Sequence, residues 1–217
     1  MLKVDHITIG YDGRNLVRDI SFELAPGECV LLAGPNGTGK TTLLKWLASR
    51  EAAVVLIPTN IPKVKGFTVE AFLRTGCYRE SDWRGRISKE VEGRMEEALK
   101  MLGIEALRKR DISTLSDGEF QKACLAIGLT RKAEVLLLDE PTAHLDVENR
   151  IDVLQTLREV ARKTGTVVLF SSHDLHDALH VADRVFVLTH DGRFLTSADH
   201  RESVLRAAFP SLSPDAL

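Results

Sequence analysis

Residues 34–41 fit the pattern G-x-x-x-x-G-K-[ST] at every fixed position, and few folds can accommodate that pattern. The segment follows an uninterrupted apolar run, 29–33, which is typical of a buried parallel strand. It precedes a predicted helix over 40–49. In that setting the glycines let successive backbone N–H groups turn inward, and the helix N-terminus adds partial positive charge. We therefore predict a phosphate-binding loop within an α/β fold.

The side chains of this loop suit a nucleotide triphosphate with its metal. Lys40 is placed to reach the β- and γ-phosphates, the Thr41 hydroxyl to bind Mg²⁺, and Thr42 to donate to the α-phosphate. The predicted nucleotide-binding residues are Gly34, Pro35, Asn36, Gly37, Thr38, Gly39, Lys40, Thr41 and Thr42.

A second apolar strand, 135–138, ends in two acidic residues, Asp139 and Glu140. The carboxyl ends of parallel strands meet at one edge of an open α/β sheet, so both acids are expected beside the phosphate loop. Asp139 is then placed to hold Mg²⁺ through a water, and Glu140 to polarise the water that attacks the γ-phosphate. Together the two segments predict a Mg-ATP hydrolase.

Elsewhere the chain alternates apolar strands with amphipathic helices, which is typical of an α/β fold. The middle third is different, because its patterns are mainly helical. We interpret 62–132 as an inserted helical subdomain, and 1–61 with 133–217 as one nucleotide-binding core, all within a single domain. Strands are expected over 2–9, 18–24, 53–57 and 166–170, helices over 88–102, 119–131, 148–163 and 175–182, a hairpin over 185–188 and 193–196, and a short helix ending at Pro210.

Charge and cysteine content narrow the choice of partners and compartment. The 29 basic and 31 acidic residues give a net charge of −2, which offers no broad electrostatic footprint for nucleic acid. Cys29, Cys77 and Cys124 are widely spaced and read as core residues rather than as a disulfide framework. The N-terminus lacks a signal-peptide pattern, and no apolar run approaches the roughly 20 residues that span a bilayer. We expect a cytoplasmic protein that reaches the inner face of the cell membrane only through another subunit.

The segment 115–119, which reads LSDGE, resembles the LSGGQ signature of ABC transporter ATP-binding subunits. The resemblance covers nearly the whole chain, because all motifs occur in the family's order. It implies a P-loop NTPase core with a mixed sheet and an inserted helical subdomain. It also implies a head-to-tail homodimer enclosing two ATP molecules. In such a dimer Ser116, Asp117, Gly118 and Glu119 face the ATP held by the other copy, where a helix N-terminus makes a second anion site.

The same resemblance assigns three further positions. Tyr11 matches the aromatic residue that stacks on adenine, although a half-buried strand tyrosine is the alternative. Asp146 matches the D-loop acid at the dimer interface, and His173 matches the switch histidine at the γ-phosphate. The implied catalytic set is Glu140, His173 and Lys40. Of seven histidines, only His173 ends a core strand at this edge; His176, His180 and His190 are expected on the surface.

Three departures from the family pattern bear on the rate of hydrolysis. Asp117 and Glu119 add negative charge beside a phosphate-binding helix start, unless Asp117 turns outward and caps that helix. Thr59, with Asn60 beside it, stands where the family has a glutamine that contacts Mg²⁺ and water. The interval 42–58 is shorter than in the family by about a strand and a helix. We still expect an active ATPase, because the catalytic set is intact.

Segments 67–70, 74–78 and 83–86 resemble the ATPases of iron-siderophore, haem and cobalamin importers. This implies a membrane permease as partner and, through it, a substrate-binding protein. We expect the surface around 60–85 to dock the permease with its exposed aromatic residues, Phe67, Phe72, Tyr78 and Trp83, although some of these can serve as core. Three alternatives stay open: an ABC ATPase of another transport system, a soluble ABC ATPase acting on ribosomes or DNA, and a nucleotide-dependent regulator that hardly hydrolyses ATP.

Overall fold

The computed structural model describes residues 2–11, 13–50, 53–197 and 201–210, except for the side chains of Tyr11 and Arg201. The main sheet has six strands in the order β4-β5-β6-β3-β7-β8. The five strands β3, β4, β5, β6 and β7 run parallel, and β8 pairs antiparallel with β7. The sheet is therefore mixed, as predicted. The strands are β3 (Cys29–Ala33), β4 (Val54–Ile57), β5 (Val135–Leu138), β6 (Val167–Ser171), β7 (Arg184–Leu188) and β8 (Phe194–Ser197).

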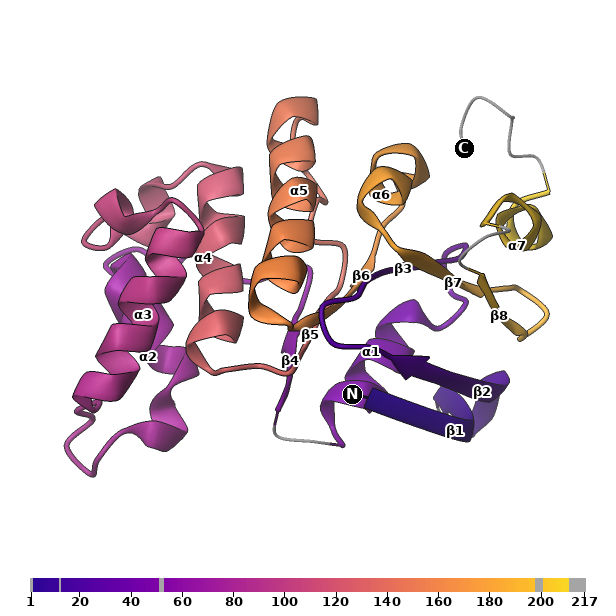
Figure 1. The fold of residues 1–217 in the computed structure, drawn as a ribbon, viewed down its shortest axis with the longest axis horizontal. Coiled ribbons are helices and arrows are strands. Elements are labelled where there is room, and N and C mark those ends of the chain that lie inside the picture. The colour runs from indigo at the N-terminus through magenta and orange to yellow at the C-terminus, as the bar shows by residue number, and fades with distance from the viewer. Residues whose placement is uncertain (1, 12, 51–52, 198–200, 211–217) are drawn as a thin grey trace.

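A separate antiparallel pair covers one side of this sheet. β1 (Leu2–Tyr11) and β2 (Arg14–Leu24) form a two-stranded ribbon, and α1 (Lys40–Ala48) lies between the ribbon and the sheet (Figure 1). The predicted strand over 18–24 therefore starts earlier, at Arg14, because antiparallel pairing with β1 continues up to the turn.

The opposite side of the sheet is covered by α5 (Val147–Thr164) and α6 (Leu175–Val181), as Figure 1 shows. The alternation along β3 separates the two cores, since successive side chains of a strand point to opposite faces. Val30 and Leu32 pack with α1 and the ribbon, whereas Leu31 and Ala33 pack with α5 and α6. The last described helix, α7 (Arg201–Ala208), contacts β7 and β8.

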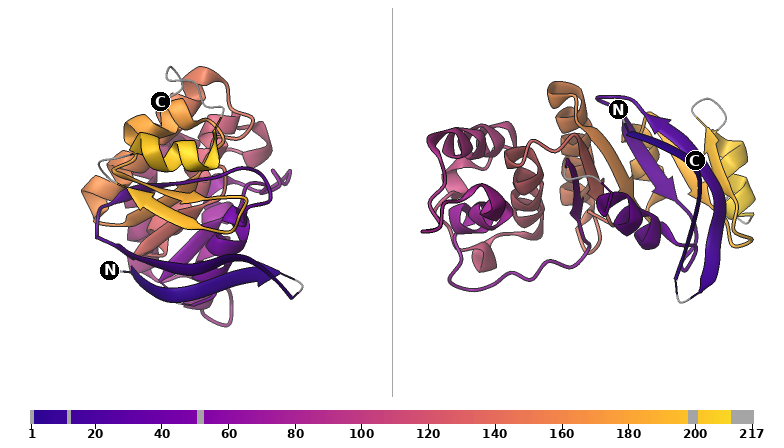
Figure 2. Two further views of the ribbon diagram at one scale, coloured as in Figure 1. Left: turned by 90° about the vertical axis from the view of Figure 1, so that its right-hand side faces the viewer. Right: turned by 90° about the horizontal axis from the view of Figure 1, so that it is seen from below.

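The chain between β4 and β5 forms a helical end of the molecule (Figure 1, Figure 2). It contains α2 (Val69–Gly76), α3 (Lys89–Met101) and α4 (Asp117–Thr130), with short 3-10 turns at Tyr78–Glu80, Glu105–Leu107 and Ile112–Thr114. Thr68, Ser88 and Ser116 cap the three helices by accepting a backbone N–H of the first turn. The subdomain boundaries at 62 and 132 stay a prediction.

Two points that the sequence left open for this end are decided by the structure. Phe72 is buried, not exposed, because it lies on the inner face of α2 and stacks on Phe120 of α4 at 5.6 Å between ring centroids. Asp117 does not cap α4, because Ser116 occupies the capping position and α4 begins at Asp117 rather than at 119. The three cysteines are buried as expected. No helix in the described part of the chain is long and apolar enough to cross a membrane.

Candidate active site

The loop between β3 and α1 curls tightly around a lysine side chain. Gly34, Gly37 and Gly39 all have positive φ angles, of 148°, 80° and 102°. A Cβ atom on Gly34 would lie 2.5 Å from the carbonyl oxygen of Leu188, so only glycine fits there. The Lys40 ammonium donates to the carbonyl oxygens of Gly34, at 2.7 Å, and Pro35, at 3.2 Å. Burial lowers the pKa of Lys40 below its ordinary value, against the opposing effect of nearby carboxylates.

Asp139, which follows β5, is held from two sides. Its Oδ2 accepts a hydrogen bond from the Thr41 hydroxyl at 2.7 Å, and its Oδ1 accepts one from the Ser171 hydroxyl at 2.9 Å. The carboxylate is buried. The structure thus brings together Thr41 and Asp139, the two residues expected to bind metal.

These two side chains fit Mg²⁺. A hydroxyl and a carboxylate are hard oxygen ligands, and Mg²⁺ is usually held by one or two protein ligands together with phosphates and waters. Among the described residues no group of three or more His, Cys, Asp or Glu side chains could hold a metal by itself. A metal at Asp139 and Thr41 would therefore depend on phosphate oxygens for the rest of its coordination.

Glu140 and His173 lie together at the same edge. The Nε2 atom of His173 is 2.5 Å from Oε1 of Glu140. Glu140 has a φ of 52°, which is unusual for a non-glycine residue, and its backbone N–H donates to the Ser171 hydroxyl at 2.9 Å. The hydroxyl of Ser171 therefore holds both neighbouring acids, Asp139 by its side chain and Glu140 by its backbone.

The Ser171 bridge was missed by the sequence analysis. The available signal was a serine at the end of a buried strand, two residues before His173. The partners of that serine depend on β6 lying directly beside β5, and the spatial order of strands is not written in the sequence.

A hollow of about 450 Å³ opens above the phosphate loop. Its lining combines the loop with the acid after β5, which is the combination needed to hold and attack a phosphate chain. The lining residues are Leu16, Asn36, Gly37, Gly39, Lys40, Thr41, Thr42 and Glu140. Leu16 was not predicted; it comes from β2, on the ribbon that carries Tyr11. The side chain of Tyr11 lies outside the described part of the structure, so its contact with adenine stays a prediction.

Thr59 and Asn60 line a different hollow, of about 400 Å³, between the end of β4 and the start of α4. The same hollow is lined by Asp117 and by His144. Thr59 and Asn60 thus lie between the carboxyl end of β4 and the LSDGE segment, and neither lines the hollow above the phosphate loop.

The LSDGE segment forms the N-terminus of α4. The Ser116 hydroxyl accepts the N–H of Glu119 at 3.1 Å, and the Glu119 carboxylate accepts the N–H of Ser116 at 2.8 Å, a reciprocal capping box. A Cβ atom on Gly118 would lie 2.6 Å from the side chain of Asn149 on α5. Among the described residues, no hydrogen bond or ion pair joins 116–119 to the phosphate loop of the same chain.

Asp146 caps the N-terminus of α5, next to the LSDGE segment. Its carboxylate accepts the backbone N–H and the side-chain amide of Asn149, both at 2.8 Å, and these hydrogen bonds hold the pKa of Asp146 below its usual range. One turn later, Arg150 forms an ion pair with Asp174, the residue after His173. The predicted D-loop is therefore joined through α5 to Asp174, the neighbour of the predicted switch histidine.

Comparison with known proteins gives one consistent family. The family model for the ABC transporter matches residues 17–143. The chain is similar to the petrobactin import ATP-binding protein FpuC of Bacillus anthracis, with 30% identity covering 87% of this chain and 78% of that protein. It is also similar to the zinc import ATP-binding protein ZnuC of a Jannaschia species, with 36% identity covering 87% and 79%.

Among solved structures, the fold is similar to that of cbiO1 from Clostridium perfringens, part of the ABC transporter complex cbiONQ. The TM-score is 0.79 at 23% identity, and the alignment covers 99% of this chain and 96% of the other. The match supports the fold over the full length of the chain.

Proposed function

Since the chain belongs to the ABC transporter family of ATPases, we propose that it drives an importer as a homodimer with two Mg-ATP molecules between its copies. The observation that carries this proposal is the arrangement at one sheet edge. Thr41 contacts Asp139 at 2.7 Å, and Glu140 lies 2.5 Å from His173 beside the phosphate loop.

The residues of this edge divide the work of phosphoryl transfer. The loop N–H groups and Lys40 bind the phosphate oxygens. Thr41 and Asp139 would hold Mg²⁺, which would supply positive charge beside those oxygens. Glu140 accepts a proton from the attacking water at its carboxylate. His173 orients that carboxylate and, once ATP is bound, donates to the γ-phosphate. The Ser171 hydroxyl fixes both acids relative to each other, which limits the geometries that the water must sample.

The test is steady-state ATP hydrolysis by wild type and Glu140→Gln. The variant is expected to lose at least about 100-fold in kcat, because it removes the general base. It is also expected to accumulate an ATP-bound dimer in analytical ultracentrifugation. Glu134→Gln is a matched control, because this exposed acid precedes the same strand at its opposite end. Equal rates for wild type and Glu140→Gln would refute the catalytic assignment, and a monomer in ATP would refute the shared site.

One observation favours a second candidate, a slowly hydrolysing nucleotide-dependent regulator. Thr59 is shorter than the glutamine of the family and lines the hollow next to α4 instead of the phosphate hollow. The variant Thr59→Gln distinguishes the active importer ATPase from the slowly hydrolysing regulator. If turnover is limited by the missing amide, this variant is expected to raise kcat with little change in the KM for ATP. An unchanged kcat would show that the short side chain does not limit the rate.

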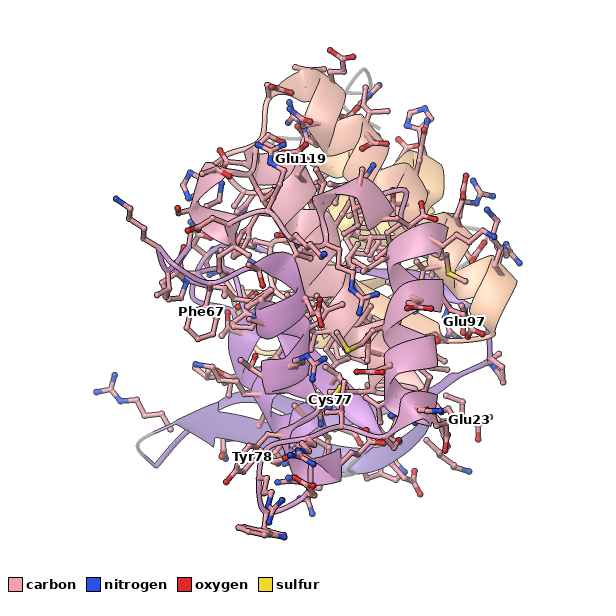
Figure 3. All side chains as sticks on the ribbon, turned by 90° about the vertical axis from the view of Figure 1, so that its left-hand side faces the viewer. Glu23, Phe67, Cys77, Tyr78, Glu97 and Glu119 are labelled. Atoms are coloured by element: carbon pink, nitrogen blue, oxygen red, sulfur yellow. The ribbon has the colours of Figure 1, made fainter. Side chains whose placement is uncertain are left out.

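For the partner, we propose a membrane permease that docks on the helical end. Figure 3 looks onto this end, where Phe67 and Tyr78 project from the surface. Tyr78 is 79% exposed and Trp83 is 85% exposed, and Arg84 stacks on the Trp83 ring at 4.3 Å. Large exposed aromatic side chains next to arginine are typical of the centres of protein interfaces. Docking would place the protein at the inner face of the membrane and link it to a substrate-binding protein.

The proposed cargo is an iron chelate, haem or cobalamin. The resemblance of 67–70, 74–78 and 83–86 to such importers supports it, and a relative such as FpuC is named for petrobactin import. The similarity to a zinc import protein makes free zinc the competing cargo.

Docking and cargo are tested with candidate importer permeases and their binding proteins, co-expressed with this chain. Co-purification is expected, as is stimulation of ATP hydrolysis by the permease and its loaded binding protein. The double variant Tyr78→Ala, Trp83→Ala is expected to lose that stimulation and keep its basal rate. Met101→Ala is the control, because Met101 is an exposed apolar residue on α3. A soluble complex with no membrane partner would overturn the docking proposal. Stimulation by zinc-loaded protein alone would overturn the cargo.

A further inference from the structure

The LSDGE segment carries two acidic residues in the first turn of α4, and each faces a basic residue from another part of the chain. The Lys63 ammonium donates to the Asp117 carboxylate at 2.6 Å and to the Leu115 carbonyl oxygen at 2.9 Å. Arg110 lies 3.8 Å from Glu119. The contacts of Lys63 are the closer and more numerous, so it is the stronger of the two counter-charges.

Lys63 is held more firmly than an ordinary surface lysine. Its side chain is 26% exposed, whereas that of Asp117 is 64% exposed. The ammonium also lies 5.3 Å from the centre of the Phe120 ring, within reach of a cation–π interaction. Three different partners therefore fix one charge at the start of α4.

The position of Lys63 connects two motifs. It lies four residues after Thr59, on the extended segment that leads from β4 to α2. Lys63, Asp117 and Thr59 line the same hollow. The side chain of Lys63 therefore links the segment that follows Thr59 to the LSDGE segment.

The charges decide whether this helix start can bind an anion. A helix N-terminus carries about half a positive charge. One uncompensated carboxylate in the first turn outweighs that charge and leaves a site that repels phosphate. With Lys63 paired to Asp117, the two side-chain charges cancel and the positive end of α4 remains. The Glu119 carboxylate is already engaged with the Ser116 N–H and sits near Arg110.

We propose that Lys63 is a positioning residue that makes the acidic signature able to bind the terminal phosphate of ATP held by the second copy. It acts by neutralising Asp117 and by fixing the Leu115 carbonyl oxygen at the start of α4. This inference rests on the proposed two-ATP dimer and adds a residue that the family signature does not contain.

The test measures ATP-dependent dimerisation in the Glu140→Gln background by analytical ultracentrifugation. Lys63→Met is compared with Lys65→Met, because Lys65 is exposed, lies two residues away and gives the same change in net charge. Lys63→Met is expected to weaken ATP binding by each LSDGE segment about threefold. Because each dimer contains two such segments, the affinity of the dimer should fall about tenfold. Lys65→Met is expected to stay within about twofold of its parent.

Rescue separates a charge effect from a purely structural one. Asp117→Asn is expected to restore dimerisation when it is added to Lys63→Met, because it removes the charge that Lys63 neutralised. Asp117→Asn alone leaves Lys63 in place and is expected to dimerise at least as tightly as its parent. Lys63→Arg is expected to retain most of the affinity. Thermal unfolding of each variant identifies any that fail to fold.

Two results would overturn the inference. One is equal dimerisation by Lys63→Met and Lys65→Met. The other is a failure of Asp117→Asn to restore the Lys63→Met variant, which would show that neutralisation of Asp117 is not its role. If the Glu140→Gln parent itself forms no dimer with ATP, the two-ATP dimer fails first, and that outcome is recognised in the parent rather than in the variants.

Discussion

At the scale of single residues, the site depends on hydroxyl groups that fix the carboxylates. Thr41 and Ser171 approach Asp139 from opposite sides, and Ser171 also receives the backbone N–H of Glu140. Such a network holds the acids in one arrangement without adding charge. In the proposed mechanism the loop and Lys40 bind the phosphates independently of this network, so its orientation acts on the chemical step more than on ATP binding.

Ser171→Ala is therefore expected to lower kcat by about tenfold while the KM for ATP changes little. The variant leaves Asp139 with one hydroxyl partner and leaves the Glu140 N–H without its acceptor, at a cost in stability of about 1–2 kcal/mol. Steady-state kinetics and urea unfolding measure the two effects.

The control for this variant is Thr130→Val, which removes another buried hydroxyl. The Thr130 hydroxyl donates to the Ala126 carbonyl oxygen within α4, away from the phosphate loop. It is expected to change stability and leave kcat unchanged. If Ser171→Ala instead raised the KM for ATP and left kcat intact, the bridge would serve binding rather than catalysis.

At the scale of elements, α4 is positioned by close contacts that only glycine permits. A Cβ atom on Gly128 would lie 2.5 Å from a methyl group of Leu136 on β5, and one on Gly76 of α2 would lie 2.5 Å from a methyl group of Ile127. These contacts place α4 against the sheet and against α2, and therefore set where its N-terminus, with the LSDGE segment, can lie.

Gly128→Ala and Gly93→Ala are expected to shift stability in opposite directions. In α3 a Cβ atom on Gly93 meets nothing within 4 Å, so alanine should stabilise the protein by up to about 1 kcal/mol. In α4 the same change forces the buried Leu136 to move, at a cost of about 1–3 kcal/mol. Urea unfolding measures both. Leu136→Val should recover part of the loss in Gly128→Ala, and the absence of recovery would contradict the contact with β5.

A charge network joins the helices of the same end. Glu70 on α2 accepts from Arg74 at 2.9 Å and from Arg108 at 3.0 Å, and Arg108 also donates to Glu96 on α3. The hydrogen bonds from Arg108 and Arg74 hold the pKa of Glu70 below its ordinary value. The network therefore stabilises the folded state only while Glu70 is ionised.

The pH dependence of this stabilisation has a definite sign. Because the folded pKa is lowered, the contribution is present above the unfolded pKa, near 4.5, and is lost as pH falls through the folded value. Glu70→Gln should therefore lower the free energy of unfolding at pH 7 by about 1 kcal/mol, with the deficit shrinking below about pH 4.5. Denaturant unfolding between pH 3.5 and 7 measures this difference. Glu97→Gln, which changes an exposed acid on α3, is the control. A deficit for Glu70→Gln that stays constant with pH would refute ionic stabilisation.

At the scale of the whole molecule, the sequence predicted those features that a local residue pattern specifies. Residues 34–41 and the acids after 135–138 were assigned correctly to one edge, because an uninterrupted apolar run and a glycine pattern are local signals. The Ser171 bridge was missed because it requires β6 between β3 and β5. Phe72 was grouped with three exposed aromatic residues, and which of the four are core could not be decided, because burial of Phe72 depends on which face α2 turns toward α4.

The three cysteines offer a test of how the helical end and the sheet are coupled. Cys29 lies on β3, Cys77 follows α2 and Cys124 lies on α4, yet all three belong to one continuous apolar core. Burial raises the pKa of Cys29 and of Cys124 to about 12, and it also raises that of Cys77. At pH 8 a thiol with a pKa near 12 is ionised to only about 10⁻⁴, so alkylation requires the core to open.

We expect pulses of iodoacetamide at increasing urea to label the three thiols along one curve that coincides with unfolding measured by circular dichroism. A continuous core opens as a single cooperative unit, so no thiol should react ahead of the others. Mg-ATP at about 100 times its Kd should raise the free energy of unfolding by about 2.7 kcal/mol, because it binds only the folded chain. All three labelling curves should then move together to higher urea. Labelling of Cys77 and Cys124 at lower urea than Cys29, or a nucleotide shift confined to Cys29, would show instead that the helical end opens independently of the ATP-binding sheet.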